Sequence, residues 1–176
     1  QEEGLADILS FAQSIFGGMA DTRDGFAGDI EGERNWGEQL TEDVQHLLAI
    51  DDLGEDFREI LQWAIQFKQD PDTDYDFKPL DELSIGCIYE KPSTRTRVSF
   101  EVGIHKLGGQ PLTLLKGDIQ MGKSESIADT GAVLSRFLDG ITYRCFGHDM
   151  VETLAESATV PVINALSDQH HPCQAA

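Results

Sequence analysis

The sequence is poor in basic residues and in cysteine. It carries 13 Lys+Arg against 32 Asp+Glu in 176 residues, which gives a formal net charge of −19. A protein that binds nucleic acid needs a basic surface to neutralise phosphates, so a partner of that class is excluded. The three cysteines, Cys87, Cys145 and Cys173, are widely spaced and odd in number, which argues against a disulfide framework.

Long apolar runs are also missing. No run approaches the length that crosses a bilayer, and no basic-then-apolar leader opens the chain. We therefore expect a soluble cytoplasmic protein with no membrane partner. The chain begins at Gln1 and stops at Ala176, directly after a motif-rich segment, so we expect a fragment of a longer protein.

The acidic excess is concentrated in the first half of the chain. Residues 1–83 hold 22 acidic and 5 basic residues, whereas residues 84–176 hold 10 and 8. We expect residues 1–42 to be an acidic extension, partly helical or disordered, because little of it can be buried. Beyond this extension, apolar residues from Phe57 to Ile65 recur at helical spacing, and this predicted helix ends before Asp70-Pro71. The nearly neutral remainder, residues 43–176, is the expected folded domain.

From Ser84 onward, short apolar runs alternate with helical periodicity. Strands are predicted over residues 84–89, 111–115, 141–145 and 160–166, and helices over residues 95–107, 125–138 and 149–157. This alternation predicts an α/β fold: a small open parallel sheet of about four strands with helices on both faces, preceded by helical segments. Ligands of such sheets bind beyond the carboxyl ends of the strands.

The segment after the first strand reads Glu-Lys-Pro-Ser-Thr-Arg-Thr-Arg over residues 90–97. Ser93 and Thr94 are natural residues for a helix start, where free backbone N–H groups and the helix dipole favour an anion. Arg95 and Arg97 differ by two positions, so one can face that anion while the other has a structural role. The alternative is a plain capped helix, but the run of hydroxyl and guanidinium groups favours phosphate binding.

After the second strand, Gly117–Ser124 matches the P-loop pattern G-x-x-x-x-G-K-[ST]. Asp118 would repel phosphates inside such a loop, yet an NTPase remains an alternative. Otherwise this is a polar loop at the ligand end of the sheet, with Gln120, Lys123 and Ser124 available.

The last two strand ends add further polar groups. Arg144 ends the third strand, either in an internal ion pair or as a second positive group at the same edge. The fourth strand leads into Asp-Gln-His-His-Pro-Cys-Gln, residues 168–174. One His and Gln174 could donate to a carbonyl or phosphate. Adjacent His side chains diverge, so no metal is expected, and Cys173 is expected to be a packing residue. We expect His46, His105 and His148 to lie away from the strand ends.

Two segments resemble a known family. Residues 90–101, Glu-Lys-Pro-Ser-Thr-Arg-Thr-Arg-Val-Ser-Phe-Glu, resemble the carbamoyl-phosphate signature of the aspartate/ornithine carbamoyltransferases, and residues 171–174, His-Pro-Cys-Gln, resemble their second signature. The likeness covers residues 46–176, the amino-terminal, carbamoyl-phosphate-binding domain. Residues 47–53, 118–122 and 164–168 favour the ornithine branch of the family.

The resemblance implies a role for each matching position. Ser93, Thr94, Arg95 and Thr96 would hold the phosphate of carbamoyl phosphate, and Thr96 would also reach its carbonyl. Arg144 and His171 would polarise the carbonyl oxygen. Gln174 would bind the carbamoyl amino group, and Gln120 would reach a neighbouring active site across a trimer interface. No cofactor is implied.

The resemblance also implies activity and partners. The δ-amino group of ornithine would attack the carbonyl carbon and phosphate would leave, giving citrulline, a step of arginine biosynthesis. L-ornithine would bind through a carboxyl-terminal domain that is absent here, so this chain would supply a half-site in a homotrimer and be inactive alone. Three alternatives remain open: aspartate or another amine as acceptor, the NTPase, and an anion-binding module without chemistry.

Overall fold

The computed structural model describes residues 46–56, 58, 78 and 80–175. The acidic extension expected over residues 1–42 and the helical pattern from Phe57 to Ile65 lie outside this part of the chain, apart from Arg58.

The described residues form one four-stranded parallel sheet with the strand order β2-β1-β3-β4. The strands are β1 (Ser84–Tyr89), β2 (Gln110–Leu115), β3 (Gly140–Arg144) and β4 (Val162–Asn164). Tyr89 pairs with Leu115 on one side and with Arg144 on the other, so the strands end at a common edge. The predicted fold class is confirmed.

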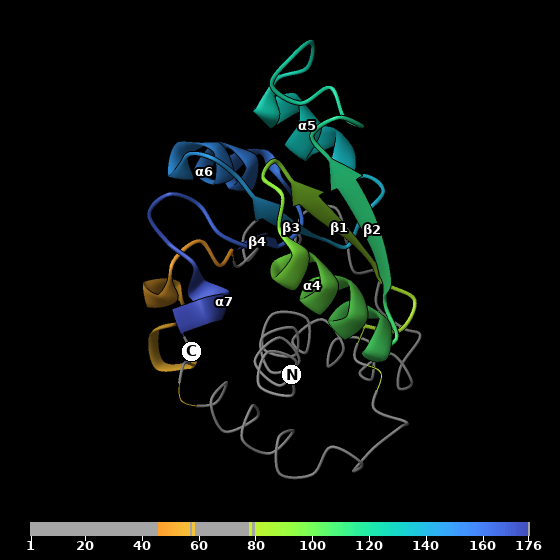
Figure 1. Cartoon of the computed structure of the whole chain (residues 1–176), viewed down its shortest axis with the longest axis vertical. Helices are drawn as coiled ribbons and strands as arrows, with labels where there is room; N and C mark the ends of the chain where they lie inside the picture. The colour runs from red at the N-terminus through yellow and green to blue at the C-terminus, as the bar shows by residue number, and fades with distance from the viewer. Residues whose placement is uncertain (1–45, 57, 59–77, 79, 176) are drawn as a thin grey trace, which may run out of the picture.

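Helices follow each of the first three strands (Figure 1). They are α4 (Thr94–Lys106), α5 (Ile127–Leu134) and α6 (His148–Ser157). Helix α5 is shorter than expected because Ser126 caps its start, accepting a hydrogen bond from the Asp129 backbone N–H, and turns follow Leu134. The sequence patterns missed two short helices, η2 (Ile50–Asp56) and α7 (Pro172–Ala175). They also missed Leu47, which pairs with Ile163 beside β4.

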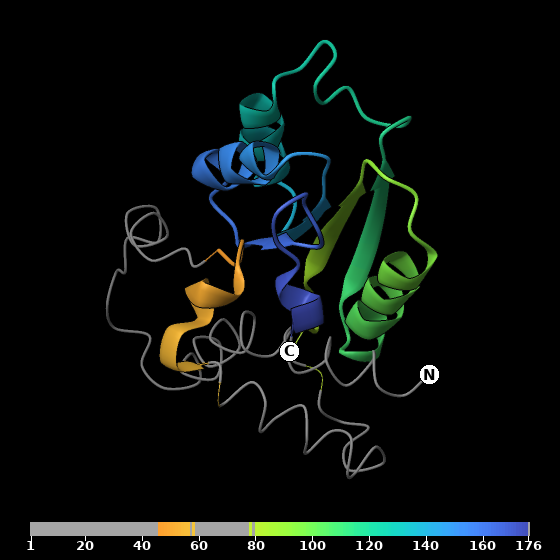
Figure 2. The same cartoon turned by 60° about the vertical axis from the view of Figure 1, so that its left-hand side comes forward.

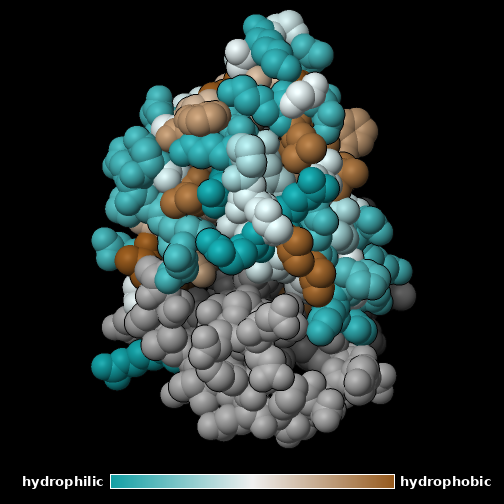
Figure 3. Space-filling model, viewed as in Figure 1, coloured by the Kyte–Doolittle hydropathy of each residue, from teal (hydrophilic) through white to brown (hydrophobic). Residues whose placement is uncertain are grey.

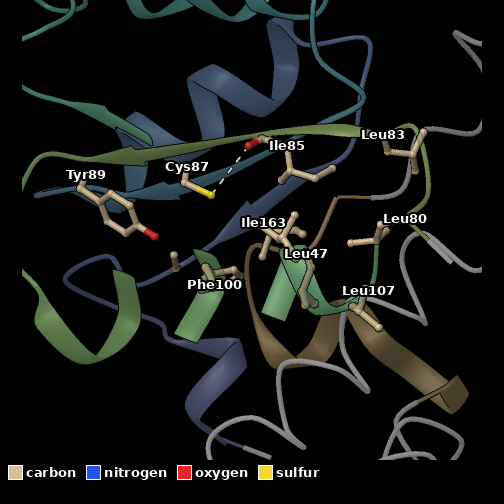
Figure 4. Close-up of a cluster of buried hydrophobic side chains, with 11 residues drawn as sticks. Leu47, Leu80, Leu83, Ile85, Cys87, Tyr89, Phe100, Leu107 and Ile163 are labelled. Atoms are coloured by element: carbon tan, nitrogen blue, oxygen red, sulfur yellow. Dashed lines mark hydrogen bonds between the residues drawn. The ribbon is translucent and has the colours of Figure 1, made fainter. Parts of the chain in front are cut away.

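The two faces of β1 bury alternate side chains against different helices, as the two-residue period of a strand requires. Ile85, Cys87 and Tyr89 pack in one cluster with Phe100 and Ile104 of α4 (Figure 4). On the opposite face the second cluster joins the sheet to α5 and α6; its buried members are Ile88, Met121, Leu138, Ile141, Tyr143, Cys145, Val151, Leu154, Ala155 and Val162. Figure 2 shows α4 on one side of the sheet and α5 with α6 on the other.

The surface carries scattered apolar side chains. On the face seen in Figure 3, brown side chains form small separate patches among teal and white ones. Exposed examples are Val98 and Val102 on α4 and Leu112 and Leu115 on β2, which is an edge strand of the sheet. None of the helices in the described part of the chain has the length and apolar character needed to span a membrane.

Gly108 ends α4 and directs the chain into β2. Its φ is +93°, a left-handed conformation that favours glycine, and a Cβ there would lie 2.9 Å from Cβ of Lys78. We expect Gly108→Ala to lower the free energy of unfolding by about 1–2 kcal/mol, measured by urea denaturation. Gly117→Ala is the matched control, because nothing lies within 4 Å of its added Cβ. Equal stability of the two variants would contradict this role for Gly108.

Candidate functional site

The carboxyl ends of β1 and β3 lie side by side at the point where the strand order reverses. The chain goes from β1 outward to β2 and then returns to the other side of β1 to form β3. Open α/β sheets bind their ligands at such a switch point. We call the ends of the four strands, with the segments that follow them, the carboxyl edge.

The start of α4 lies at this edge, directly after β1. Ser93 is its N-cap residue, in extended conformation, and its side chain makes no capping hydrogen bond. Thr94 and Arg95 are exposed, and the Arg95 side chain forms no hydrogen bond or ion pair with another described residue. The first turn of a 13-residue helix therefore presents backbone N–H groups without a side-chain acceptor from Ser93, the arrangement that favours an anion.

Arg97 has the structural role that its two-residue offset from Arg95 allowed. Its Nε lies 2.7 Å from Oε1 of Glu101, one turn further along α4, and Thr113 of β2 also donates to that carboxylate. Burial alone would raise the pKa of Glu101, but hydrogen bonds from Thr113 and Arg97 outweigh it, so the pKa lies below its usual value. Arg97 thus helps to join α4 to β2 and leaves Arg95 for a ligand.

Arg144, the last residue of β3, reaches across to α4. Its Nη1 donates to Oγ1 of Thr96 over 3.1 Å. Its Nε is buried and has no hydrogen-bond partner among the described residues, and none of their carboxylates forms an ion pair with it. The internal ion pair considered from sequence is therefore absent from the described part of the chain. A half-buried guanidinium without a carboxylate is costly unless an anion or carbonyl oxygen completes it.

His171 lies near Arg144 at the carboxyl edge, half buried after β4. Burial and then the positive charge of Arg144 lower the pKa of His171, so its imidazole is neutral at pH 7. Its Nδ1 is buried and has no hydrogen-bond partner within the described ranges. The structure therefore brings together Thr96, Arg144 and His171, which come from three different segments.

The two glutamines differ in placement. Gln174 lies in α7, where its backbone N–H donates to the His171 carbonyl, and its side chain is exposed. Gln120 lies between β2 and α5, in the segment that projects beyond the sheet at the top of Figure 1. Oε1 of Gln120 accepts a hydrogen bond from Ser124 in the same loop. The structure thus does not join Gln120 to the other residues of the carboxyl edge.

The P-loop pattern does not adopt P-loop geometry. Lys123 Nζ donates to the Lys116 and Ile119 carbonyls, at 3.0 and 3.2 Å, inside its own loop. Helix α5 begins at Ile127, three residues after Ser124. In a nucleotide-binding P-loop the Lys reaches the phosphates, a role that this contact does not serve.

A buried carboxylate at this edge was not predicted. The side chain of Glu90, which follows β1, is only 3% exposed and accepts from Lys116 Nζ and from the Phe146 backbone N–H, each at 3.3 Å. Lys91 and Lys116 both place Nζ over the exposed Phe146 ring, at 4.8 and 4.9 Å from its centroid. Lys116 follows β2 and Phe146 follows β3. Their contacts with Glu90 could be predicted only from the order of the strands in the sheet, which places β1 between β2 and β3.

The cysteines have packing roles. Cys173 packs, as expected, against the buried cluster that includes Phe100 and Ile104 of α4, and burial raises its pKa to about 12. Cys87 and Cys145 are buried, and burial raises the pKa of each to about 11. Thiols with such pKa values hold almost no thiolate at neutral pH, so none is a nucleophile here.

One prediction about histidine was wrong. His148 does not lie away from the strand ends: it begins α6 four residues after Arg144, and its Nδ1 lies 2.9 Å from Oγ of Ser167. The prediction failed because it placed the start of α6 at Asp149 and took no account of the chain turning back after β4. The sequence indicates Ser167 only as part of residues 164–168, which resemble the ornithine branch of the family.

Fold and site together define a class: an open parallel α/β domain whose carboxyl edge collects hydroxyl, guanidinium and imidazole groups at the switch point. Residues 45–176 match the family described as "Aspartate/ornithine carbamoyltransferase, carbamoyl-P binding domain". The chain belongs to the aspartate/ornithine carbamoyltransferase family.

Several ornithine carbamoyltransferases are similar to this chain. That of Methanopyrus kandleri is 51% identical over 134 residues, which are 75% of this chain and 43% of the relative. The solved structure from Pyrococcus furiosus has a TM-score of 0.70 and 47% identity, covering 74% of this chain and 42% of that one. The structure from Burkholderia thailandensis also has a TM-score of 0.70, with 38% identity and coverage of 75% and 46%. The chain thus spans less than half the length of these relatives.

The lowered pKa of His171 predicts a pH effect on stability. As the pH falls below the ordinary value of 6.5, the unfolded chain takes up this proton before the folded chain does, so the stability present above pH 6.5 is progressively lost. We expect urea unfolding at pH 7.5 and 5.5 to show a smaller loss for His171→Gln than for the wild type. His46, whose pKa is also lowered by burial, contributes equally to both proteins. An identical loss of stability in the wild type and in His171→Gln would contradict the lowered pKa of His171.

Proposed function

We propose that residues 43–176 are a carbamoyl-phosphate-binding domain that works with an amino-acid-binding domain to carbamoylate the δ-amino group of ornithine. Membership of the family supports the reaction class, and the ornithine carbamoyltransferase relatives support the acceptor. The single observation that carries the proposal is Arg144: a half-buried guanidinium bonded to Thr96, close to His171, with no carboxylate partner in the described chain.

The phosphate of carbamoyl phosphate would bind at the start of α4. Ser93, Thr94 and Arg95 offer hydroxyl, guanidinium and backbone N–H donors there, and the helix dipole favours the dianion. Thr96, the third residue of α4, accepts a hydrogen bond from Arg144 at the end of β3. The phosphate would thus be fixed with its carbamoyl group toward Arg144 and His171.

The carbonyl oxygen would accept from Arg144 and from His171, which is neutral because its pKa is lowered. As the ornithine nitrogen attacks the carbonyl carbon, negative charge grows on that oxygen and these donors stabilise it. The C–O bond to phosphate then breaks, phosphate leaves with the electron pair, and the attacking nitrogen loses a proton. Gln174 would accept from the carbamoyl NH2 group.

The remaining parts of the proposal concern assembly and context. We propose a homotrimer in which the Gln120 loop enters a neighbour's site; the projection of this loop and the exposed Leu112 and Leu115 on edge strand β2 support it. Ornithine would bind on the second domain, so this chain would hold a half-site and not turn over by itself. The reaction would belong to arginine biosynthesis in the cytoplasm.

Titration calorimetry of the purified chain tests the proposal. We expect one site for carbamoyl phosphate per chain, competition by inorganic phosphate, no binding of ATP, and no citrulline when ornithine is added. Binding of ATP that is lost in Lys123→Ala would instead support the NTPase. Phosphate binding without preference for carbamoyl phosphate would indicate an anion-binding module.

A further inference from the structure

The segment that carries His171 is held in a strained conformation. Leu166, two residues beyond β4, has a φ of +117°, which side chains rarely adopt. Its N–H donates to Asn164 Oδ1 at 3.0 Å, and its carbonyl accepts from the Cys145 N–H at 3.1 Å. Hydrogen bonds with Asn164 and with Cys145, the residue after Arg144, therefore hold Leu166 in a backbone conformation that it would not keep without them.

Ser167, buried at 3% exposure, is the centre of the bonds that hold this segment. Its Oγ faces three N–H donors: the backbone of Gln169 at 3.2 Å, the backbone of His170 at 3.1 Å and Nδ2 of Asn164 at 3.4 Å. A hydroxyl has two lone pairs and one proton, so these donors already fill its accepting capacity. Its proton is left for an acceptor.

His148 supplies that acceptor. Its Nδ1 lies 2.9 Å from Ser167 Oγ, closer than the His170 carbonyl at 3.3 Å. With Nδ1 as the acceptor, the ring N–H is at Nε2, and this nitrogen lies 3.8 Å from Oε1 of Glu152. The ring also packs edge-on against His170, 4.9 Å between centroids.

A second bond joins the same two segments. The His148 backbone N–H donates to Asp168 Oδ1 at 2.8 Å, so a carboxylate from beyond β4 caps the start of α6. Gly147, the N-cap residue, has no side chain for this. The turn after Arg144 and the segment before His171 are therefore bonded through both the side chain and the backbone of His148.

We propose that His148 and Ser167 are positioning residues that hold His171 beside Arg144. Neither would touch carbamoyl phosphate. Their pair locks the strained segment at Leu166 to the turn following β3, which fixes the relative placement of the two groups that polarise the carbonyl. This inference rests on the proposed function for its catalytic meaning, whereas the placement itself can be measured in the chain without ligand.

The test measures the pKa of His171 by NMR titration of its imidazole, assigned with His171→Gln, in the ligand-free chain. Ser167→Ala and His148→Ala should both move this pKa up toward its ordinary value, because His171 leaves its buried place near Arg144. His148→Asn, which keeps an acceptor near the position of Nδ1, should restore the wild-type value. His105→Ala, an exposed histidine on α4, is the matched control.

Affinity for carbamoyl phosphate is measured in the same variants. We expect it to fall roughly ten- to hundredfold in Ser167→Ala and His148→Ala, as displaced site groups do, and to recover in His148→Asn. If the His148→Ala variant folds and the pKa of His171 is unchanged in it, the proposal is overturned, whatever its affinity for carbamoyl phosphate. If the pKa moves but the wild type never binds carbamoyl phosphate, the positioning role stands and the proposed function fails.

Discussion

Replacing Arg144 by Ala should weaken carbamoyl-phosphate binding to this chain by roughly ten- to hundredfold, the range for losing a charge-assisted hydrogen bond. In an enzyme assembled with the amino-acid-binding domain, the turnover number should fall by about 10²–10³, as for a removed oxyanion donor. Folding should change little, because the Arg144 side chain has no ion pair in the described chain and its hydrogen bond there is to Thr96, while the backbone bond that the Arg144 carbonyl accepts from Glu90 is kept.

Two further variants serve as controls for the effect of Arg144→Ala on binding. Arg136→Ala removes an exposed arginine from the turn after α5 and should leave binding unchanged. Arg144→Lys keeps the charge but not the planar guanidinium, so its affinity should lie between those of the wild type and Arg144→Ala. Titration calorimetry at one salt concentration gives the affinities, and near-wild-type binding by Arg144→Ala would show that the anion binds elsewhere.

Replacing Ser93 by Asp should have opposite effects on stability and on binding. Asp is a good N-cap residue and interacts favourably with the helix dipole, so the free energy of unfolding should rise by about 0.5–1 kcal/mol. The same carboxylate would occupy the anion position and repel a phosphate dianion about 4 Å away, so affinity should fall by more than about tenfold.

Ser93→Asn separates capping from charge. Asn caps a helix about as well as Asp and carries no charge, so it should preserve most of the affinity while keeping only the part of the stability gain that comes from capping. Urea denaturation gives the stabilities and calorimetry the affinities. Unchanged binding by Ser93→Asp would contradict a phosphate position at the start of α4.

The sheet and most of the carboxyl edge could be predicted because they depend on local patterns. The buried strand of residues 84–89 and the helix-start residues after it are read directly from the sequence, and parallel pairing brings strand ends together wherever the strands lie. Arg144 and the pair His170-His171 are placed at this edge by their positions after the third and fourth strands, whereas the choice of His171 and the role of Thr96 came from the family resemblance.

What failed depended on contacts between distant segments. The pairs His148–Ser167 and Glu90–Lys116 join residues 19 and 26 positions apart, and no periodicity reports such pairs. Strand β4 ends before its apolar run does, and beyond its end Leu166 takes a left-handed conformation, bonded to Asn164 and Cys145, that its own preference does not indicate. Residues 117–124 match the P-loop pattern in sequence but not in geometry, because the Lys123 side chain donates to backbone carbonyls of its own loop.

The most direct measurement is an amide NMR titration of the chain with carbamoyl phosphate. The account predicts that the largest shifts fall on the backbone N–H groups of Thr94, Arg95 and Thr96, with smaller shifts at Arg144 and His171, and that inorganic phosphate reproduces only the first set. Shifts confined to residues 117–124, or no shifts at residues 94–96, would contradict it.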